Sequence, residues 1–351
     1  MSLLRAYAST ASTSEDRSRA IACVSGGIAL GNMIGPGLQL LFTPFGAEGI
    51  NVLGLTISIY TSPALFCLLL NGLGLLIVQF AFEEKYIIQH GKNVKEGEED
   101  NGEVKKVNKI GNPDFIAVLL CVFTRFLQIF LNTTTESIGS AYLMMMFSLE
   151  KEVAVSVNAG IHTVGGGIAA AMFVSFIFTN FRKCFRMRLF TVISLIIPLI
   201  WLIATYPYSF YSDRVKIMVN GSHADCDLSK YSWCADQPKV NEYIYIGGYI
   251  MVFGIAYTII NITVTTIYSK VVGPRPQGTY QGIYQTAGSF GRMLAPILMS
   301  YSYTAYGPSV PWFILIVSFM ILISAWIVLR ERMVPFGRYE TTKIEPSDQK
   351  I

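Results

Sequence analysis

The chain has 351 residues, of which 52% are hydrophobic and only 14% are charged, and its formal net charge is +4. A soluble protein of this length needs more polar side chains to cover its surface, so the composition excludes an ordinary soluble protein and indicates a lipid bilayer as the surrounding medium. The charged residues are also clustered, which leaves long uncharged runs along the chain.

These runs have the length of membrane-spanning helices, because about 20 helical residues cross ~30 Å of hydrocarbon. Two further runs of this length are apolar except for a single arginine each, Arg125 and Arg292. A Gly-Pro pair at 307–308 separates the last two runs. The sequence therefore predicts eight spans, at 21–45, 57–82, 115–136, 153–181, 189–212, 243–269, 280–301 and 310–329.

An even number of spans places both termini on one side of the membrane, and the distribution of Lys and Arg indicates which side. The segments on the side of the termini contain 20 Lys and Arg residues, whereas the opposite segments contain 5. Positively charged segments stay in the cytosol, so both termini are expected to be cytosolic. This asymmetry accounts for the net charge, and no nucleic-acid partner is expected.

The polar segments divide the chain into parts. Residues 83–113 mix acids with lysines and predict a solvated cytosolic linker. We expect 1–82 to belong to an N-terminal helix bundle and 114–332 to form a C-terminal bundle of six helices. Residues 333–351 are expected to be a cytosolic tail.

The loop at 207–241 differs in composition from the cytosolic segments. It contains Cys226, Cys234 and the glycosylation sequon Asn220-Gly-Ser. Both features belong to the secretory lumen or the cell exterior, so we expect a Cys226–Cys234 disulfide and a glycan on Asn220. The six cysteines form no CxxC and no His-Cys spacing, so no metal site is expected.

One internal repeat is visible. Gly31-Asn-Met-Ile-Gly-Pro36 in the first span, which includes Gly35, matches Gly291-Arg-Met-Leu-Ala-Pro296 in the seventh. Glycine and proline in membrane helices allow close packing and bending. If the two spans are equivalent, the repeat unit has six helices, which is the plan of a class of secondary transporters.

Polar residues follow the helical period in the spans that such a plan places around a central cavity. A polar stripe facing lipid is costly, so these faces should turn toward one another or toward water. The sequence predicts a substrate or ion pathway formed by Arg125, Gln128, Asn132, Glu136, His162, Asn261, Gln285 and Arg292.

Several short motifs are the basis of a family resemblance. They are Arg5-Ala-Tyr-Ala-Ser-Thr10 and Glu15-Asp-Arg17, Gly31-xxx-Gly35-Pro36, Thr135-Glu136, Pro274-Arg-Pro-Gln-Gly278 and Gly288-Ser-xx-Arg292-xxx-Pro296. With these motifs the chain resembles the major facilitator superfamily (MFS), and within it the lysosomal MFS domain-containing proteins of the neuronal ceroid-lipofuscinosis type. The basic turn at 181–188 lacks the Gly and Asp that the family has there.

The resemblance implies an all-α polytopic membrane protein with the MFS fold, whose eight transmembrane helices correspond to helices 5–12. Helices 1–4 would then lie outside this sequence. It also implies a permease of endolysosomal membranes that carries a small molecule or an ion and needs no cofactor.

Three functions are compatible with these features. The first is a secondary transporter in which two bundles rock around a site at the membrane midplane, with Glu136 and His162 as a proton-coupling pair. The second is an anion channel-like permease, because two intramembrane arginines outnumber one acid. The third is a truncated accessory subunit that transports nothing. An enzyme is not expected, because HExxH, GxSxG and P-loop motifs are all missing.

Overall fold

The computed structural model describes most of the helical part of the chain. The linker at 83–113, Asn220 and most of the tail lie outside the described residues. Described are residues 4, 7–8, 11–12, 17–42, 49–52, 55–58, 61–81, 114–178, 187–217, 226, 228, 230–273, 275 and 277–333.

Within these stretches, eight long helical segments occupy the positions of the eight predicted spans. Six are long and apolar enough to cross a membrane, whereas α2 and α9 are less apolar because they carry many glycines and polar residues. The helices are α2 (Arg17–Phe42), α3 (Thr61–Ala81), α4 (Phe115–Phe147), α5 (Lys151–Phe178), α6 (Met187–Ala204), α7 (Glu242–Met251), η5 (Val252–Ala256), α8 (Tyr257–Val272), α9 (Gln277–Tyr306) and α10 (Ser309–Val328).

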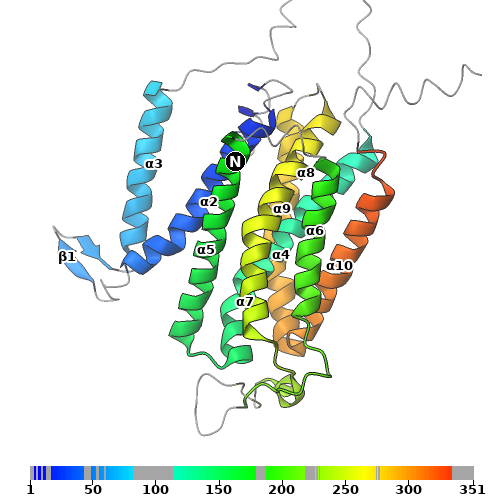
Figure 1. The fold of residues 1–351 in the computed structure, drawn as a ribbon. Helices are drawn as coiled ribbons and strands as arrows, with labels where there is room; N and C mark the ends of the chain where they lie inside the picture. Colours follow the sequence, from blue (N-terminus) through cyan, green and yellow to red (C-terminus); the bar gives the residue numbers. More distant parts are fainter. Residues whose placement is uncertain are drawn as a thin grey trace, which may run out of the picture.

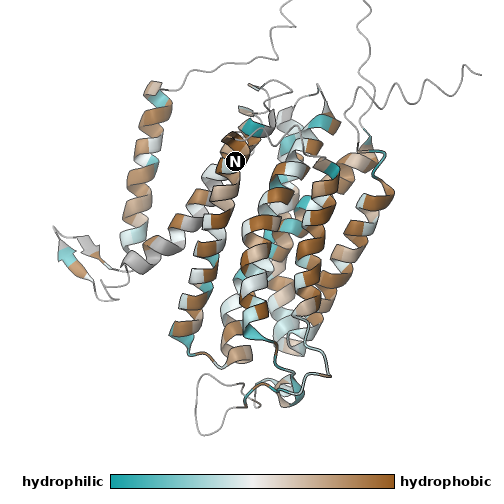
Figure 2. Ribbon diagram, in the orientation of Figure 1, coloured by the Kyte–Doolittle hydropathy of each residue, from teal (hydrophilic) through white to brown (hydrophobic). Residues whose placement is uncertain are grey.

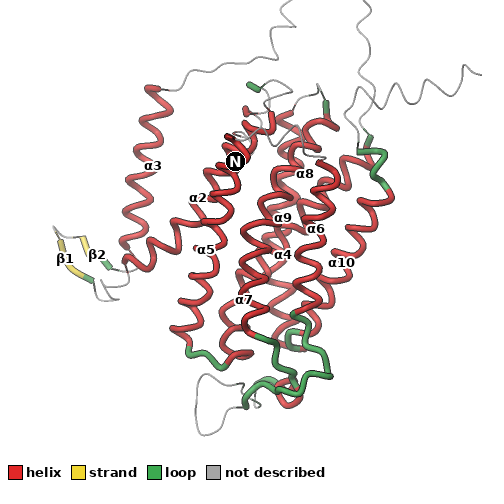
Figure 3. The backbone as a smooth tube through the Cα atoms, viewed as in Figure 1, coloured by secondary structure: helices red, strands yellow, loops and turns green. Residues whose placement is uncertain are grey.

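The helices cross the molecule in alternating directions (Figures 1 and 3). The start of α2 and the end of α10 lie at one end, and the loop between α6 and α7 lies at the opposite end. The short segment η5 joins α7 to α8 without a break, so Glu242–Val272 acts as one span. This arrangement agrees with an even number of spans, while the side that faces the cytosol stays a prediction.

The most buried spans are α4 and the α7–η5–α8 rod, each with 67% of its apolar window inside the molecule. By contrast, none of the apolar window of α3 is buried, and most of its large apolar side chains are exposed. Figure 2 shows α3 as a largely hydrophobic helix to the side of the bundle. The outward faces of the bundle are also rich in exposed Leu, Ile, Val and Phe. Such surfaces are stable in lipid and not in water.

A short hairpin precedes α3 and was not expected from the sequence. Strand β1 (Ile50–Val52) pairs in antiparallel fashion with β2 (Leu55–Ile57). Gly49, with φ +69°, lies so close to this hairpin that a Cβ atom there would be 2.6 Å from the carbonyl oxygen of Ile57. The predicted second span is therefore shorter at its start, and the helix begins at Thr61.

Glycines at two helix crossings allow the helices to pack closely in the middle of the bundle. On α9, a Cβ atom at Gly291 would lie 2.8 Å from the Phe126 carbonyl oxygen of α4. On α2, Gly26 meets the Phe173 side chain of α5. Small residues at such crossings allow close backbone approach, as in membrane helices generally.

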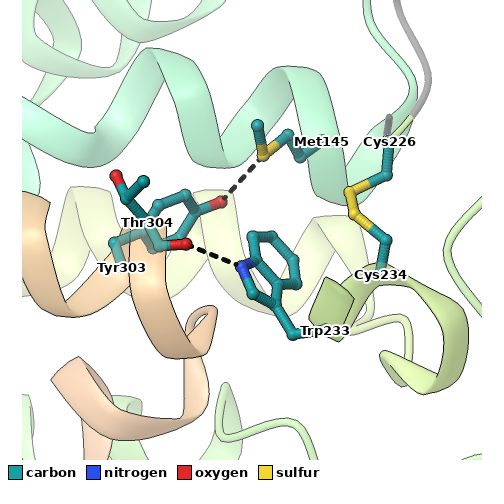
Figure 4. The surroundings of a disulfide bond; sticks show 6 residues. All are labelled: Met145, Cys226, Trp233, Cys234, Tyr303 and Thr304. Carbon is teal, nitrogen blue, oxygen red and sulfur yellow. Dashed lines mark hydrogen bonds between the residues drawn. A yellow bond between two sulfur atoms is a disulfide. The ribbon is translucent and has the colours of Figure 1, made fainter. Parts of the chain in front are cut away.

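The α6–α7 loop is folded against the end of the bundle (Figure 4). Cys226 and Cys234 form a disulfide in it. The neighbouring Trp233 donates a hydrogen bond of 3.1 Å from its Nε1 to the carbonyl oxygen of Thr304, in the last turn of α9. At Gly307, φ is +72° and a Cβ atom would lie 2.8 Å from the Trp233 ring, so the turn after α9 requires glycine for two reasons.

Candidate functional site

A cavity of about 710 Å³ lies between α2, α4, α5, the η5–α8 segment and α9. Its volume is typical of small-molecule sites, which span roughly 300–1,000 Å³. Seven of the eight residues predicted for the pathway line it, and they are Arg125, Asn132, Glu136, His162, Asn261, Gln285 and Arg292.

Arg125 is the most buried charge in this wall, with 6% of its surface exposed. One terminal nitrogen donates to Gln128 Oε1 at 3.1 Å and to Asn261 Oδ1 at 3.3 Å. The other donates to Gln285 Oε1 at 3.3 Å. The guanidinium group also lies over the ring of Tyr284, 5.6 Å from its centroid. Arg125 is therefore held between α4, α8 and α9 by neutral groups.

Gln128, the eighth residue predicted for the pathway, contacts Arg125 instead of lining the central cavity. Its side chain is 3% exposed and does not line the central cavity. It accepts the hydrogen bond from Arg125 and donates its own amide N–H to the Tyr257 carbonyl oxygen at 3.3 Å. Gln128 thus connects Arg125 to the start of α8.

Glu136 and Arg292 face the cavity from opposite helices. Both are more exposed to it than Arg125 is. Arg292 is the charge that interacts with the Glu136 carboxylate, and the Asn132 side chain lies within hydrogen-bonding reach of it.

His162 of α5 is held by a cluster of aromatic rings. Its Nε2 lies 3.0 Å from the Tyr249 hydroxyl, and its ring meets Phe253 edge to face. Tyr249 in turn stacks on Trp201, whose Nε1 donates to the Tyr245 carbonyl oxygen at 3.1 Å. The imidazole therefore has a fixed orientation at the cavity wall.

The π-helical segment η5 brings two rings to the same wall. Phe253 and Tyr257 both line the cavity, with ring planes 7° apart and centroids 6.0 Å apart. A Cβ atom at Gly254 would lie 2.8 Å from the Ile168 side chain, so α5 packs directly on this segment. Single π-helical turns in longer helices are frequent at functional sites.

The glycines of the repeated motif do not have equal surroundings. Gly291 forms the crossing with α4, whereas no atom lies within 4 Å of a Cβ atom built at Gly31 or Gly35. Both of those glycines line the cavity, and the Pro36 side chain is outside the described residues. Pro296 lies within the continuous helix α9. A packing role for Gly31 and Gly35 stays a prediction.

Other cavity residues were missed by the sequence analysis. Gly288 lies so close to Arg125 that a Cβ atom there would be 3.3 Å from Nε of the arginine. Phe253 was also missed, although the spacing of four residues from Tyr245 through Tyr249 to Tyr257 is readable in the sequence. In the described part of the chain, no group of three or more His, Cys, Asp or Glu side chains has the arrangement of a metal site.

Comparison with known proteins agrees with this architecture. The profile of the Major Facilitator Superfamily matches residues 1–296. The chain is also 27% identical, over 368 aligned residues, to Major facilitator superfamily domain-containing protein 8 of Xenopus laevis; the alignment covers 97% of this chain and 71% of that protein. An all-α bundle of apolar helices around a polar cavity, together with the match over most of the sequence, establishes that the chain belongs to the major facilitator superfamily.

Proposed function

We propose that this protein moves a small solute across an endolysosomal membrane, through the cavity that contains Arg125, Glu136 and Arg292. The observation that carries the proposal is the convergence of charged and amide side chains from four helices on one cavity inside an apolar bundle. Ionisable residues at membrane depth are costly, and they mark substrate or ion pathways by default.

The extent of the cavity supports a cargo site near the membrane midplane, where secondary transporters bind their cargo. Its lining includes Ser25 near the start of α2 and Ser140 towards the far end of α4, so it extends along much of the membrane depth. Transporters of this plan alternate access by moving one group of helices against another around a central site.

Protons are the proposed coupling ion. Glu136 and His162 line the same cavity from α4 and α5. Both side chains can exchange protons in an acidic compartment, and chains of Glu and His serve as proton relays in transporters. A proton taken up by Glu136 would also release Arg292 from its interaction with the carboxylate, which links protonation to the charge of the site.

The proposal is tested in intact cells. A tagged chain is expressed in cells that lack it, and lysosomes are isolated and analysed for small molecules by mass spectrometry. The expected result is co-purification of the chain with lysosomes, and at least one solute whose lysosomal amount changes with the native chain but not with Arg125→Gln. A chain that fractionates with another membrane would contradict the location, and an unchanged solute profile would contradict the transport function.

An anion-conducting pore is the second candidate. It is favoured by Arg125, which has no carboxylate within salt-bridge distance among the described residues. A pore predicts anion currents in patch-clamped lysosomes that do not depend on a proton gradient. A transporter predicts uptake that depends on the gradient and little steady current.

A further inference from the structure

In the part of the chain that the structure describes, no carboxylate group neutralises the charge of Arg125. Its side chain donates hydrogen bonds to neutral amide oxygens, those of Gln128, Asn261 and Gln285. The nearest acid on the same helix, Glu136, is eleven residues away and interacts with Arg292. A buried cation without a counter-ion is costly, so an anionic ligand would stabilise this site strongly.

The amide groups fix the guanidinium group and leave part of it unused. A guanidinium group has five N–H donors, and the three hydrogen bonds to amide oxygens occupy three of them. The Nε atom is buried and has no hydrogen-bond partner. The other unused donor is on the terminal nitrogen that also bonds Gln285. Arginine binds carboxylate and phosphate groups through pairs of such donors.

The backbone of α9 approaches Arg125 closely at Gly288, which helps to fix the position of the arginine side chain. A Cβ atom there would lie 3.3 Å from Nε and 3.5 Å from Cγ of Arg125. Arg125 itself lines the cavity, so the side chain is reachable from the polar space in the middle of the bundle.

The cavity offers a second, apolar element for the rest of a ligand. Phe253 and Tyr257 are half-buried and nearly parallel, and both line the cavity that Arg125 lines. Aromatic faces in this arrangement accept another flat ring by offset stacking. The volume of about 710 Å³ also exceeds what a single hydrated inorganic ion requires and suits a small organic molecule.

We propose that the cavity binds a small planar organic anion, with its negative group at Arg125 and its ring against Phe253 and Tyr257. The proposal names the substrate class of the transport site and therefore rests on the proposed function. It assigns the amide cage of Gln128, Asn261 and Gln285 the task of orienting the cation without cancelling its charge.

Binding to the purified full chain in lipid nanodiscs tests the proposal without any transport step. The probes are benzoate, phenylacetate and indole-3-acetate, each compared with its neutral amide. We expect each acid to bind at least tenfold more tightly than its amide. Arg125→Gln should weaken binding of the acids by roughly tenfold to a hundredfold, as for the loss of hydrogen bonds to a charged group. Arg125→Lys should recover part of this loss.

Two further measurements examine the ring and the fold. Acetate has the negative charge without the ring, and it should bind to the native chain roughly twofold to tenfold less tightly than benzoate does. Benzoate should bind to Phe253→Ala less tightly than to the native chain by a similar factor. Arg214→Gln removes an exposed arginine of the α6–α7 loop outside the cavity and should bind benzoate as the native chain does. Each variant is compared only if it elutes as a single species in size-exclusion chromatography.

Several outcomes overturn the proposal. Equal binding of acids and amides, or acid binding that survives Arg125→Gln in the folded variant, removes Arg125 as the anion site. Chloride or acetate binding as tightly as the aromatic acids removes the planar ligand. Uptake of [¹⁴C]benzoate into proteoliposomes separates the two proposals: binding without uptake contradicts the transport function alone, and uptake of a neutral solute by a chain that binds no acid contradicts this inference alone.

Discussion

The Tyr249 hydroxyl lies 3.0 Å from Nε2 of His162, and this contact joins α7 to α5 at the wall of the cavity. Tyr249 is fully buried, while His162 is only partly buried and reaches the cavity. The tyrosine therefore orients the imidazole from behind. Which atom donates depends on the tautomer of His162, so the hydrogen bond can follow a change in the protonation of the ring.

Replacing Tyr249 by Phe tests this orienting role. The ring still fills its place beside Trp201, and only the hydroxyl is lost, so the chain should fold. Losing one hydrogen bond of ~0.5–1.5 kcal/mol corresponds to a roughly twofold to tenfold slower transport rate, if the orientation matters in the rate-limiting step. The measurement is solute uptake between pH 5 and 7.5. Tyr243→Phe, at an exposed position of α7, is the control. The same pH profile in Tyr249→Phe and the native chain would show that the hydroxyl is not needed.

Glu136→Gln removes the acid of the cavity and keeps its shape. We expect uptake to lose its dependence on an inward proton gradient, because Gln can neither bind nor release a proton in this range. The matched control is Glu152→Gln, which changes an exposed acid at the start of α5. An uptake rate that responds to pH in the same way in Glu136→Gln and the native chain would exclude Glu136 from coupling.

The crossing of α4 and α9 should be sensitive to one added methyl group. Gly291→Ala places a Cβ atom 2.8 Å from the Phe126 carbonyl oxygen, and such overpacking costs roughly 1–3 kcal/mol. Gly278→Ala, on the same helix, meets no atom within 4 Å and should be neutral or slightly stabilising. Thermal unfolding of the purified chain in detergent measures both. Equal melting temperatures for the two variants would contradict the close crossing.

The disulfide of the α6–α7 loop is expected to stabilise the fold. Cross-linking two cysteines eight residues apart contributes about 2–3 kcal/mol in the chain-entropy description. The double change Cys226→Ser and Cys234→Ser should therefore lower the melting temperature of the native chain, and a reducing agent should lower it to a similar value. Cys67→Ser changes an exposed free cysteine of α3 and should have no effect. A melting temperature that is insensitive to the double change would show that the loop contributes little.

The glycosylation sequon provides a test of topology. If the α6–α7 loop faces the lumen, the chain should carry one glycan on Asn220, and Asn220→Gln should remove it. The measurement is the mobility of the chain in gel electrophoresis before and after treatment with an N-glycosidase. If the enzyme does not change the mobility of the native chain, the predicted sidedness is contradicted. If the enzyme shifts the native chain but not Asn220→Gln, the predicted sidedness is supported.

The helices were predictable because a helix that crosses the hydrocarbon core of a membrane needs a long stretch of apolar residues. Runs with at most one or two charged residues identified all eight segments. Arg125 and Asn132 of the polar stripe on α4 are buried. The main difference in length is α4, predicted to end near Glu136 and observed to end at Phe147. A polar residue in a buried helix does not end it, because the rest of the bundle can accommodate that residue.

The surroundings of the site residues could not be predicted from the spacing of residues alone. The helical period predicted that Gln128 lies on the same face of the helix as Arg125. It could not show that Gln128 connects Arg125 to the Tyr257 carbonyl oxygen. The π-helical turn at Val252–Ala256 changes the register of every residue after it, and no sequence signal for it was recognised. The contact of Trp233 with Gly307 joins segments far apart in the chain, and it depends on tertiary packing rather than on local preference.

That contact has a mechanical consequence. Trp233 is fixed to the last turn of α9 through Thr304, and Tyr303 of the same turn donates to the Met145 sulfur of α4. The loop connects α6 to α7 along the chain and contacts α9 through Trp233, and the hydrogen bond between Tyr303 and Met145 extends the connection to α4. Because the loop and these two hydrogen bonds join them, we expect the ends of α4, α6, α7 and α9 to move together when the cavity opens at this end.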